Sequence, residues 1–389
     1  MNKLTRTLTV LTTGAALAAG AAACGSSSSS GGSSSGGAAN GSGGGANVAA
    51  AKKIVDAHLG IQPFTPPGPA FDASKARGKT VYEIPVSSNV PFNVLTGAAM
   101  KQALATVGVK AVIAPTQGQP SQWVQGMNQA IAAKADAIAI LGMDPQAIGP
   151  QIKAAKDAGI PTVEDHFIDA KHPNPKGYEN VAARIPAPYF DAGQLSAAYA
   201  ISDKGAKTNA IIVTSKDILS AGDVVTGIQQ EFSKDCPACK TTVVNVPFND
   251  WASKMQTAVQ SALVKEPQAN YIIPVFDGMV QFAAPAVTAA GAASRVKIAS
   301  YNATPSVLRM MQDGNVIAMN SGESYDWLGY ALADQLLRVL TGTKPVASEK
   351  VPLRAFVKSN VNETGTPPAV NKGYGNAYLL GYKKLWGVG

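Results

Sequence analysis

The chain has 389 residues, of which 46% are hydrophobic, so it carries enough apolar material for two folded domains with buried cores. Its formal net charge is +8, but the lysines and arginines are scattered and form no arginine-rich run or basic helix. The composition therefore argues against a nucleic-acid-binding surface and favours a folded protein with a mildly cationic exterior.

The first residues have the pattern of an export signal. Lys3 and Arg6 give a positive start, residues 8–23 are apolar or small, and Cys24 follows three alanines. The pattern resembles a bacterial lipoprotein signal, in which residues 1–23 are removed and Cys24 is lipidated, although Ala21 stands where that signal usually has leucine. A plain secretory peptide with an incidental cysteine is the alternative.

Two segments separate this signal from the first expected strand. Residues 24–47 are almost entirely Ser, Gly, Ala and Asn, which predicts a flexible tether between a membrane and a folded body. Residues 48–78 form an N-terminal extension, with a short amphipathic helix followed by a proline-rich piece.

From residue 79 the chain alternates between apolar strands and helices. In the first unit, a strand over 80–86 leads through a polar turn into a helix that begins at Pro91. Further strands are expected at 110–114, 135–141, 160–164, 178–183, 209–214, 241–246, 269–276, 296–301 and 316–320. Compact apolar strands with helices between them are typical of parallel sheets covered on both faces. The number of strands predicts an α/β protein with two doubly wound parallel-sheet lobes.

Cys236 and Cys239 form a CPAC motif between an expected helix and the next strand. In an exported protein such a pair is most simply a disulfide. A redox site would place the pair at the start of a helix, and a zinc site would need a second pair of ligands.

Four short motifs, in their order and spacing, support a family resemblance. They are residues 89–92 (NVPF), 163–165 (VED), 275–279 (VFDGM) and 300–305 (SYNATP). Over roughly residues 79–358 the chain resembles the type I periplasmic solute-binding proteins of ABC transporters, in particular the ribose- and galactose-binding group.

The resemblance implies two lobes that close by hinge motion over a small solute. The chain would cross between the lobes near residues 188, 323 and 352. The implied division is lobe 1 at 79–187 and 324–351, lobe 2 at 188–323 and 352–360, and a C-terminal tail at 361–389. The resemblance also implies a monomeric, non-enzymatic binding protein without cofactor or metal. It would be exported, lipid-anchored to the outer face of the cell membrane, and partnered by an ABC permease.

The expected ligand is a sugar or sugar-like polyol, held by side chains at the strand ends. Carboxylates can accept hydrogen bonds from neighbouring hydroxyls, and aromatic faces can cover the C–H side of a sugar ring. The predicted ligand-binding residues are Asn89, Phe92, Trp123, Asp165 and His166 in the first lobe, Tyr189, Asp217, Phe248, Asp277 and Asn302 in the second, and Glu323 at a crossing.

Ordinary structural roles remain open for several of these residues. Phe92 and Trp123 could pack in a core, and Asp165 and Asp277 could cap a helix or a turn. The sugar-binding group often has arginine where this chain has His166, and a second arginine where this chain has 223–226. Without those bidentate donors, a flatter, less hydroxylated or cationic ligand is the alternative.

Three other functions compete with transport on the same sequence features. A sensory receptor would use the same closure as a transport receptor. A glycosidase could use Asp165 and Asp277 as a carboxylate pair. A sugar-responsive repressor would need a helix-turn-helix where this chain has a signal and a tether.

Overall fold

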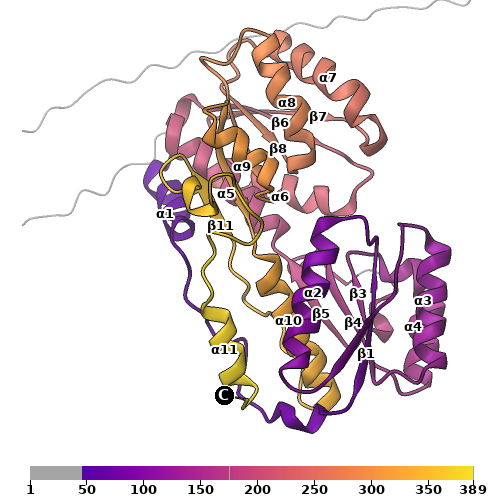
Figure 1. The fold of residues 1–389 in the computed structure, drawn as a ribbon. Helices are drawn as coiled ribbons and strands as arrows, with labels where there is room; N and C mark the ends of the chain where they lie inside the picture. Colours follow the sequence, from indigo (N-terminus) through magenta and orange to yellow (C-terminus); the bar gives the residue numbers. More distant parts are fainter. Residues whose placement is uncertain (1–45, 175, 389) are drawn as a thin grey trace, which may run out of the picture. The chain divides into compact units, whose positions relative to one another are not determined.

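The computed structural model describes residues 46–174 and 176–388 (Figure 1). The signal sequence, the lipidation site Cys24 and nearly all of the tether therefore lie outside the described residues. Within the described part, every helix is too short or too polar to cross a bilayer.

The first sheet has five parallel strands in the order β2-β1-β3-β4-β5. The strands are β1 (Thr80–Pro85), β2 (Lys110–Ile113), β3 (Ala137–Leu141), β4 (Thr162–Asp169) and β5 (Ala183–Ala187). Alternate side chains point to opposite faces, so Val81 packs under one helix pair and Ile84 under another. The first pair is α2 (Pro91–Ala105) with α10 (Tyr325–Thr341), and the second is α3 (Pro120–Ala132) with α4 (Gly149–Asp157).

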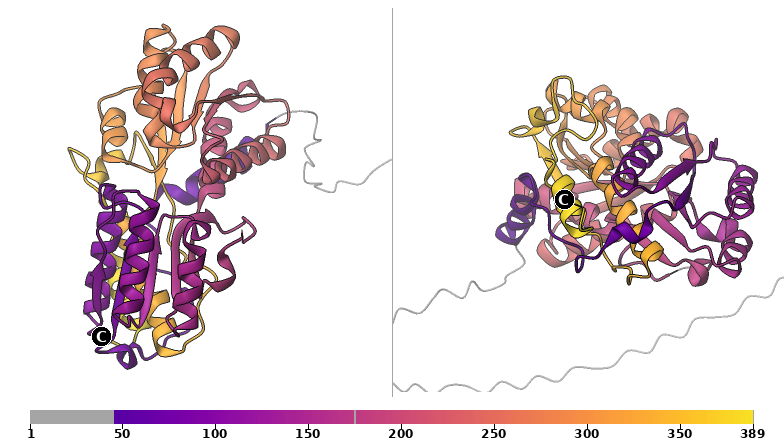
Figure 2. Two further views of the ribbon diagram at one scale, coloured as in Figure 1. Left: turned by 90° about the vertical axis from the view of Figure 1, so that its right-hand side faces the viewer. Right: turned by 60° about the horizontal axis from the view of Figure 1, so that its bottom comes forward.

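The second sheet has six strands in the order β11-β10-β9-β8-β6-β7, and only the pairing of β10 with β11 is antiparallel. The strands are β6 (Asn209–Thr214), β7 (Lys240–Asn245), β8 (Tyr271–Pro274), β9 (Lys297–Tyr301), β10 (Ile317–Gly322) and β11 (Arg354–Val357). Its helices are α5 (Tyr189–Lys204), α6 (Leu219–Asp235), α7 (Trp251–Lys265), α8 (Asp277–Ala289) and α9 (Pro305–Gln312) (Figure 2). The two helix-covered sheets confirm the predicted fold class.

Two local expectations differ from the structure. The strand expected at 178–183 is a single 3-10 turn at Tyr178–Asn180, and β5 begins at Ala183. The backbone of Gly177 has φ 103°, and the Val181 N–H donates to the Tyr178 carbonyl, so this stretch turns before it can pair. The short edge strand β11 has no counterpart among the expected strands.

A disulfide joins Cys236 and Cys239 between the end of α6 and the start of β7. It closes the short loop in which the sequence expects it.

Both terminal segments connect the two lobes. Helix α1 (Val48–Leu59) buries Ala51 and Val55 in the core of the second lobe. Phe64 follows it, and its ring centroid lies 6.1 Å from that of Trp327 in the first lobe. At the other end, β11 belongs to the second sheet, whereas α11 (Ala377–Leu385) packs on α10. These links add to the three crossings β5 to α5, β10 to α10 and α10 to β11.

Helices α5 and α6 approach each other closely at Gly227. A Cβ atom at Gly227 would collide with the carbonyl oxygen of Phe190 in α5, whereas one at Gly222 in the same helix would meet nothing within 4 Å. The close approach of α5 and α6 therefore requires glycine at position 227 but not at position 222.

We expect Gly227→Ala to lower the free energy of unfolding by about 2 kcal/mol, because the helices must separate. Gly222→Ala is the matched control and should be neutral or stabilising by up to about 1 kcal/mol, because alanine favours helix. Urea unfolding followed by circular dichroism measures both. Equal effects of the two substitutions would contradict the close approach.

Candidate functional site

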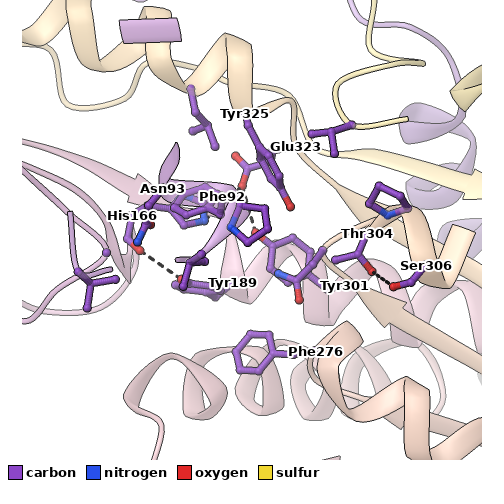
Figure 3. Close-up of a pocket in the computed structure, with 18 residues that line it drawn as sticks. Phe92, Asn93, His166, Tyr189, Phe276, Tyr301, Thr304, Ser306, Glu323 and Tyr325 are labelled. Atoms are coloured by element: carbon purple, nitrogen blue, oxygen red, sulfur yellow. Dashed lines mark hydrogen bonds and ion pairs between the residues drawn. The ribbon is translucent and has the colours of Figure 1, made fainter. Parts of the chain in front are cut away.

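A cavity of about 550 Å³ lies where the strand ends of the two sheets meet (Figure 3). This position is expected, because ligands bind at the carboxyl ends of the strands in open α/β sheets. The size suits a small solute. The lining residues are Val86, Val90, Pro91, Phe92, Asn93, Gly142 and His166 from the first lobe, Tyr189, Phe276, Tyr301, Asn302, Thr304, Pro305 and Ser306 from the second, and Glu323, Tyr325, Leu328 and Val370.

Aromatic rings form a connected wall around the cavity. Phe92 is the second residue of α2 and lies edge-on to Tyr325 at the start of α10, with ring centroids 5.1 Å apart. The His166 ring is 4.7 Å from Phe92 and 5.7 Å from Tyr189. Tyr189 in turn lies edge-on to Tyr301 at 6.1 Å. Rings from both lobes can therefore contact one ligand (Figure 3).

The backbone at the cavity adopts conformations that side-chain-bearing residues rarely take. His166 has φ 65°, Asn302 has φ 124° and Ala303 has φ 47°. Such positive φ values cost free energy and persist only where surrounding contacts hold them. The Asn302 N–H donates to the Ser321 carbonyl at 2.8 Å, and the Ala303 N–H donates to the Asn320 side chain at 2.9 Å. These bonds fix the loop after β9 at the cavity wall.

Glu323 brings the one carboxyl group among the lining residues of the described chain. Its side chain is only 4% exposed, and its Oε2 accepts a hydrogen bond from the Tyr301 hydroxyl at 3.0 Å. Burial raises the pKa of Glu323 to about 8 and lowers the pKa of His166 to about 3. The His166 Nε2 lies 3.9 Å from Glu323, but an imidazole with such a pKa is neutral near pH 7, so the two do not form an ion pair there.

Two further acids lie beneath the cavity, on the face of the first sheet that α2 and α10 cover. Glu83 in β1 and Asp165 in β4 are fully buried, and their carboxyl oxygens accept no hydrogen bond from the described residues. Burial raises the pKa of Glu83 to about 8. Burial raises the pKa of Asp165 well above its ordinary value, and the nearby Glu164, Glu323 and Glu83 add to this rise.

Five of the predicted ligand-binding residues line the cavity together: Phe92, His166, Tyr189, Asn302 and Glu323. They come from both lobes and from the crossing between β10 and α10.

Four others lie outside it and have structural partners. Asn89 is exposed, and its N–H donates to Ser87 Oγ. The Trp123 indole donates to the Val86 carbonyl at 2.9 Å. Asp217 accepts from the Phe248 N–H at 3.0 Å, and the Phe248 ring is 55% exposed.

Asp165 and Asp277, which were expected to reach the ligand from opposite lobes, also lie outside the cavity. The Asp165 side chain points under α2 and α10 instead of past the strand end. The Asp277 carboxylate accepts hydrogen bonds from Ser300, from Asn320, and from both the backbone and the hydroxyl of Thr304. Its acceptor capacity is used in holding the loop after β9, so it has a structural role.

The sequence reasoning missed several lining residues. Phe276 directly precedes α8, and Tyr301 ends β9, so their strand-end position was a usable signal. Tyr325 stands two residues after Glu323, at the start of α10. Val370 belongs to the C-terminal tail, whose sequence gives no indication that it returns to the cavity.

Comparison with known proteins finds a matching family model and several similar binding proteins. A family model described as "Periplasmic binding protein domain" matches residues 81–344. The D-ribose/D-allose-binding protein of Pseudomonas aeruginosa is 28% identical over 202 residues, which cover 51% of this chain and 61% of that protein, so less than two thirds of its length is matched. The fructose import binding protein FruE of Bifidobacterium longum is 24% identical over 253 residues, covering 64% of this chain and 75% of the relative.

Solved structures share the fold at low identity. A periplasmic ribose ABC transporter protein from Conexibacter woesei has a TM-score of 0.66 at 18% identity, with 75% of this chain and 96% of that chain covered. A solute-binding protein from Actinobacillus succinogenes with bound D-allose has a TM-score of 0.63 at 18% identity, with 73% of this chain and 99% of that chain covered.

The buried acids predict an unusual dependence of stability on pH. Because the pKa of Glu83 is about 8 in the folded protein against an ordinary value of 4.5, the folded state holds this proton more tightly than the unfolded state. The stabilisation is complete below the ordinary pKa and is lost as the pH rises through the folded pKa. We therefore expect the free energy of unfolding to fall between about pH 5 and about pH 8, by up to about 1.4 kcal/mol per pH unit for each such group.

Urea unfolding of Glu83→Gln across this pH range tests the expectation. The variant should lose less stability than the wild type as the pH rises. Asp157→Asn, on the exposed side of α4, is the control and should follow the wild type. If the free energy of unfolding fell with pH equally steeply in Glu83→Gln and in the wild type, the proposed protonation of Glu83 would be contradicted.

Proposed function

The chain belongs to the periplasmic binding protein domain family, and from this we propose that it is the substrate-binding lipoprotein of an ABC importer that captures a sugar or sugar-like polyol. It works outside the cytoplasm, anchored to the outer face of the cell membrane through Cys24, and delivers its ligand to a membrane permease as a monomer.

The observation that carries this proposal is the cavity lined from both lobes. Phe92 and His166 come from the first lobe, Tyr189 and Tyr301 from the second, and Glu323 from a crossing, so closure of the lobes would enclose a ligand on all sides. The aromatic faces suit the C–H surfaces of a sugar ring. The names of the relatives, which refer to ribose, allose and fructose, support the same ligand class.

The proposal contains no catalytic step. A glycosidase would need two carboxyl groups flanking one bond, and the candidate pair was Asp165 and Asp277. Both lie outside the cavity, and Asp277 is held by four hydrogen bonds. Binding and release therefore account for the site better than hydrolysis.

The proposal is tested by isothermal titration calorimetry of the purified protein with D-ribose, D-allose, allitol and D-fructose. We expect at least one of them to bind. Phe92→Ala should weaken that binding by at least about tenfold, about 1.4 kcal/mol, because it removes an aromatic ring that lines the cavity.

Phe248→Ala is the matched control, because it removes an aromatic ring that lies outside the cavity. Its affinity should equal that of the wild type. Binding that responded to Phe248→Ala but not to Phe92→Ala would place the ligand elsewhere. Failure of all four compounds to bind would remove the support for a neutral sugar or polyol as the ligand.

A further inference from the structure

The cavity has an acid without a basic partner. Its lining, all of it within the described residues, includes Glu323 but no lysine or arginine. Glu323 Oε2 accepts a hydrogen bond from Tyr301, whereas Oε1 accepts none from the described residues. One oxygen of this carboxyl group is therefore left for a ligand.

An ionised carboxylate in such a place needs a positive charge nearby. Burial of an unpaired carboxylate is costly, so a buried acid either pairs with a cation or keeps its proton, as Glu323 does near pH 7 with its pKa raised to about 8. The basic side chain that lines the cavity, His166, is neutral near pH 7 because burial lowers its pKa to about 3. The remaining neighbours of Glu323 in the cavity are the hydroxyl-bearing rings of Tyr189, Tyr301 and Tyr325.

The same rings suit a cation. Electron-rich aromatic faces attract ammonium groups, most strongly where water is excluded. The rings of Phe92 and Tyr325 meet edge to face with centroids 5.1 Å apart, and those of Tyr189 and Tyr301 do so at 6.1 Å. All four residues line the cavity together with Glu323 (Figure 3). A carboxyl group and aromatic rings that line one cavity offer a protonated amine both an anionic partner and cation–π contacts.

Neutral polar groups line the second-lobe edge of the cavity. The Asn302 Oδ1 accepts the Asp277 N–H, which leaves the amide nitrogen to donate, and Ser306 offers a hydroxyl group. Such groups bind hydroxyls without supplying charge. The cavity thus combines one carboxyl group, which a cationic ligand would ionise, with neutral hydrogen-bonding positions.

We propose that the ligand is an amine-bearing sugar or polyol, whose ammonium group donates to Glu323 while its hydroxyls bind the Asn302 and Ser306 side. This inference rests on the proposed function, since it specifies the class of sugar-like ligand that the same site takes.

The test uses matched pairs that differ by one amino group for one hydroxyl: D-glucosamine with D-glucose, D-galactosamine with D-galactose, and 1-amino-1-deoxy-D-sorbitol with D-sorbitol. Calorimetry on the full chain should show at least one amine binding at least about tenfold more tightly than its hydroxyl partner. Glu323→Gln should reduce that ratio to about one, and Asp157→Asn should leave it unchanged.

The outcomes separate the two proposals. Hydroxyl compounds that bind as tightly as their amine partners would overturn the amine inference and leave the proposed sugar-binding function intact. Binding by none of the six compounds, together with none of the four sugars and polyols named above, would overturn both. The affinity ratios of amine to hydroxyl partner are measured on the wild-type protein, so they test the inference even if Glu323→Gln does not fold.

Discussion

The close packing of α10 on α2 brings the start of each helix to the cavity. At Gly329 in α10, a Cβ atom would lie 2.5 Å from the carbonyl oxygen of Thr96 in α2, so only glycine permits this separation. With the helices this close, Phe92 at the start of α2 meets Tyr325 at the start of α10 edge to face. The crossing that precedes α10 then carries Glu323 into the same space. Much of the binding wall therefore depends on one helix contact that lies outside the wall itself.

The charge of the site depends on the buried acids that lie beneath the contact between α2 and α10. Glu83 and Asp165 occupy an apolar layer in which burial favours their neutral forms. Glu323 sits at the edge of that layer, among aromatic rings, and burial favours its neutral form as well. An empty cavity would therefore carry little charge at neutral pH, and a cationic ligand would ionise Glu323 on arrival and release its proton. The low polarity of the surroundings makes such a pairing stronger than it would be in water.

The sequence predicted the fold well because its pattern is local. Apolar strands alternate with helices from Thr80 onward, and each unit can be recognised from its own residues. The site was harder because side-chain direction and partners depend on distant residues. Asp165 follows an apolar strand as a ligand-binding residue would, yet the pleat turns it under α2. Asp277 is taken up by Ser300, Asn320 and Thr304, which lie 23 to 43 residues away in the chain. No local pattern could show that Val370, far along the tail, closes part of the wall.

The terminal segments bear on how this protein should be handled as a reagent. The matched family region ends at residue 344, but Trp386 stacks on Tyr330 and donates its indole N–H to Asp334, and Phe64 packs beside Trp327. A fragment trimmed to the family boundaries would leave these rings of α10 bare to water and would be prone to aggregate. Expression designs and fluorescent biosensors based on this scaffold should keep residues 46–388 whole and attach reporters at exposed loops.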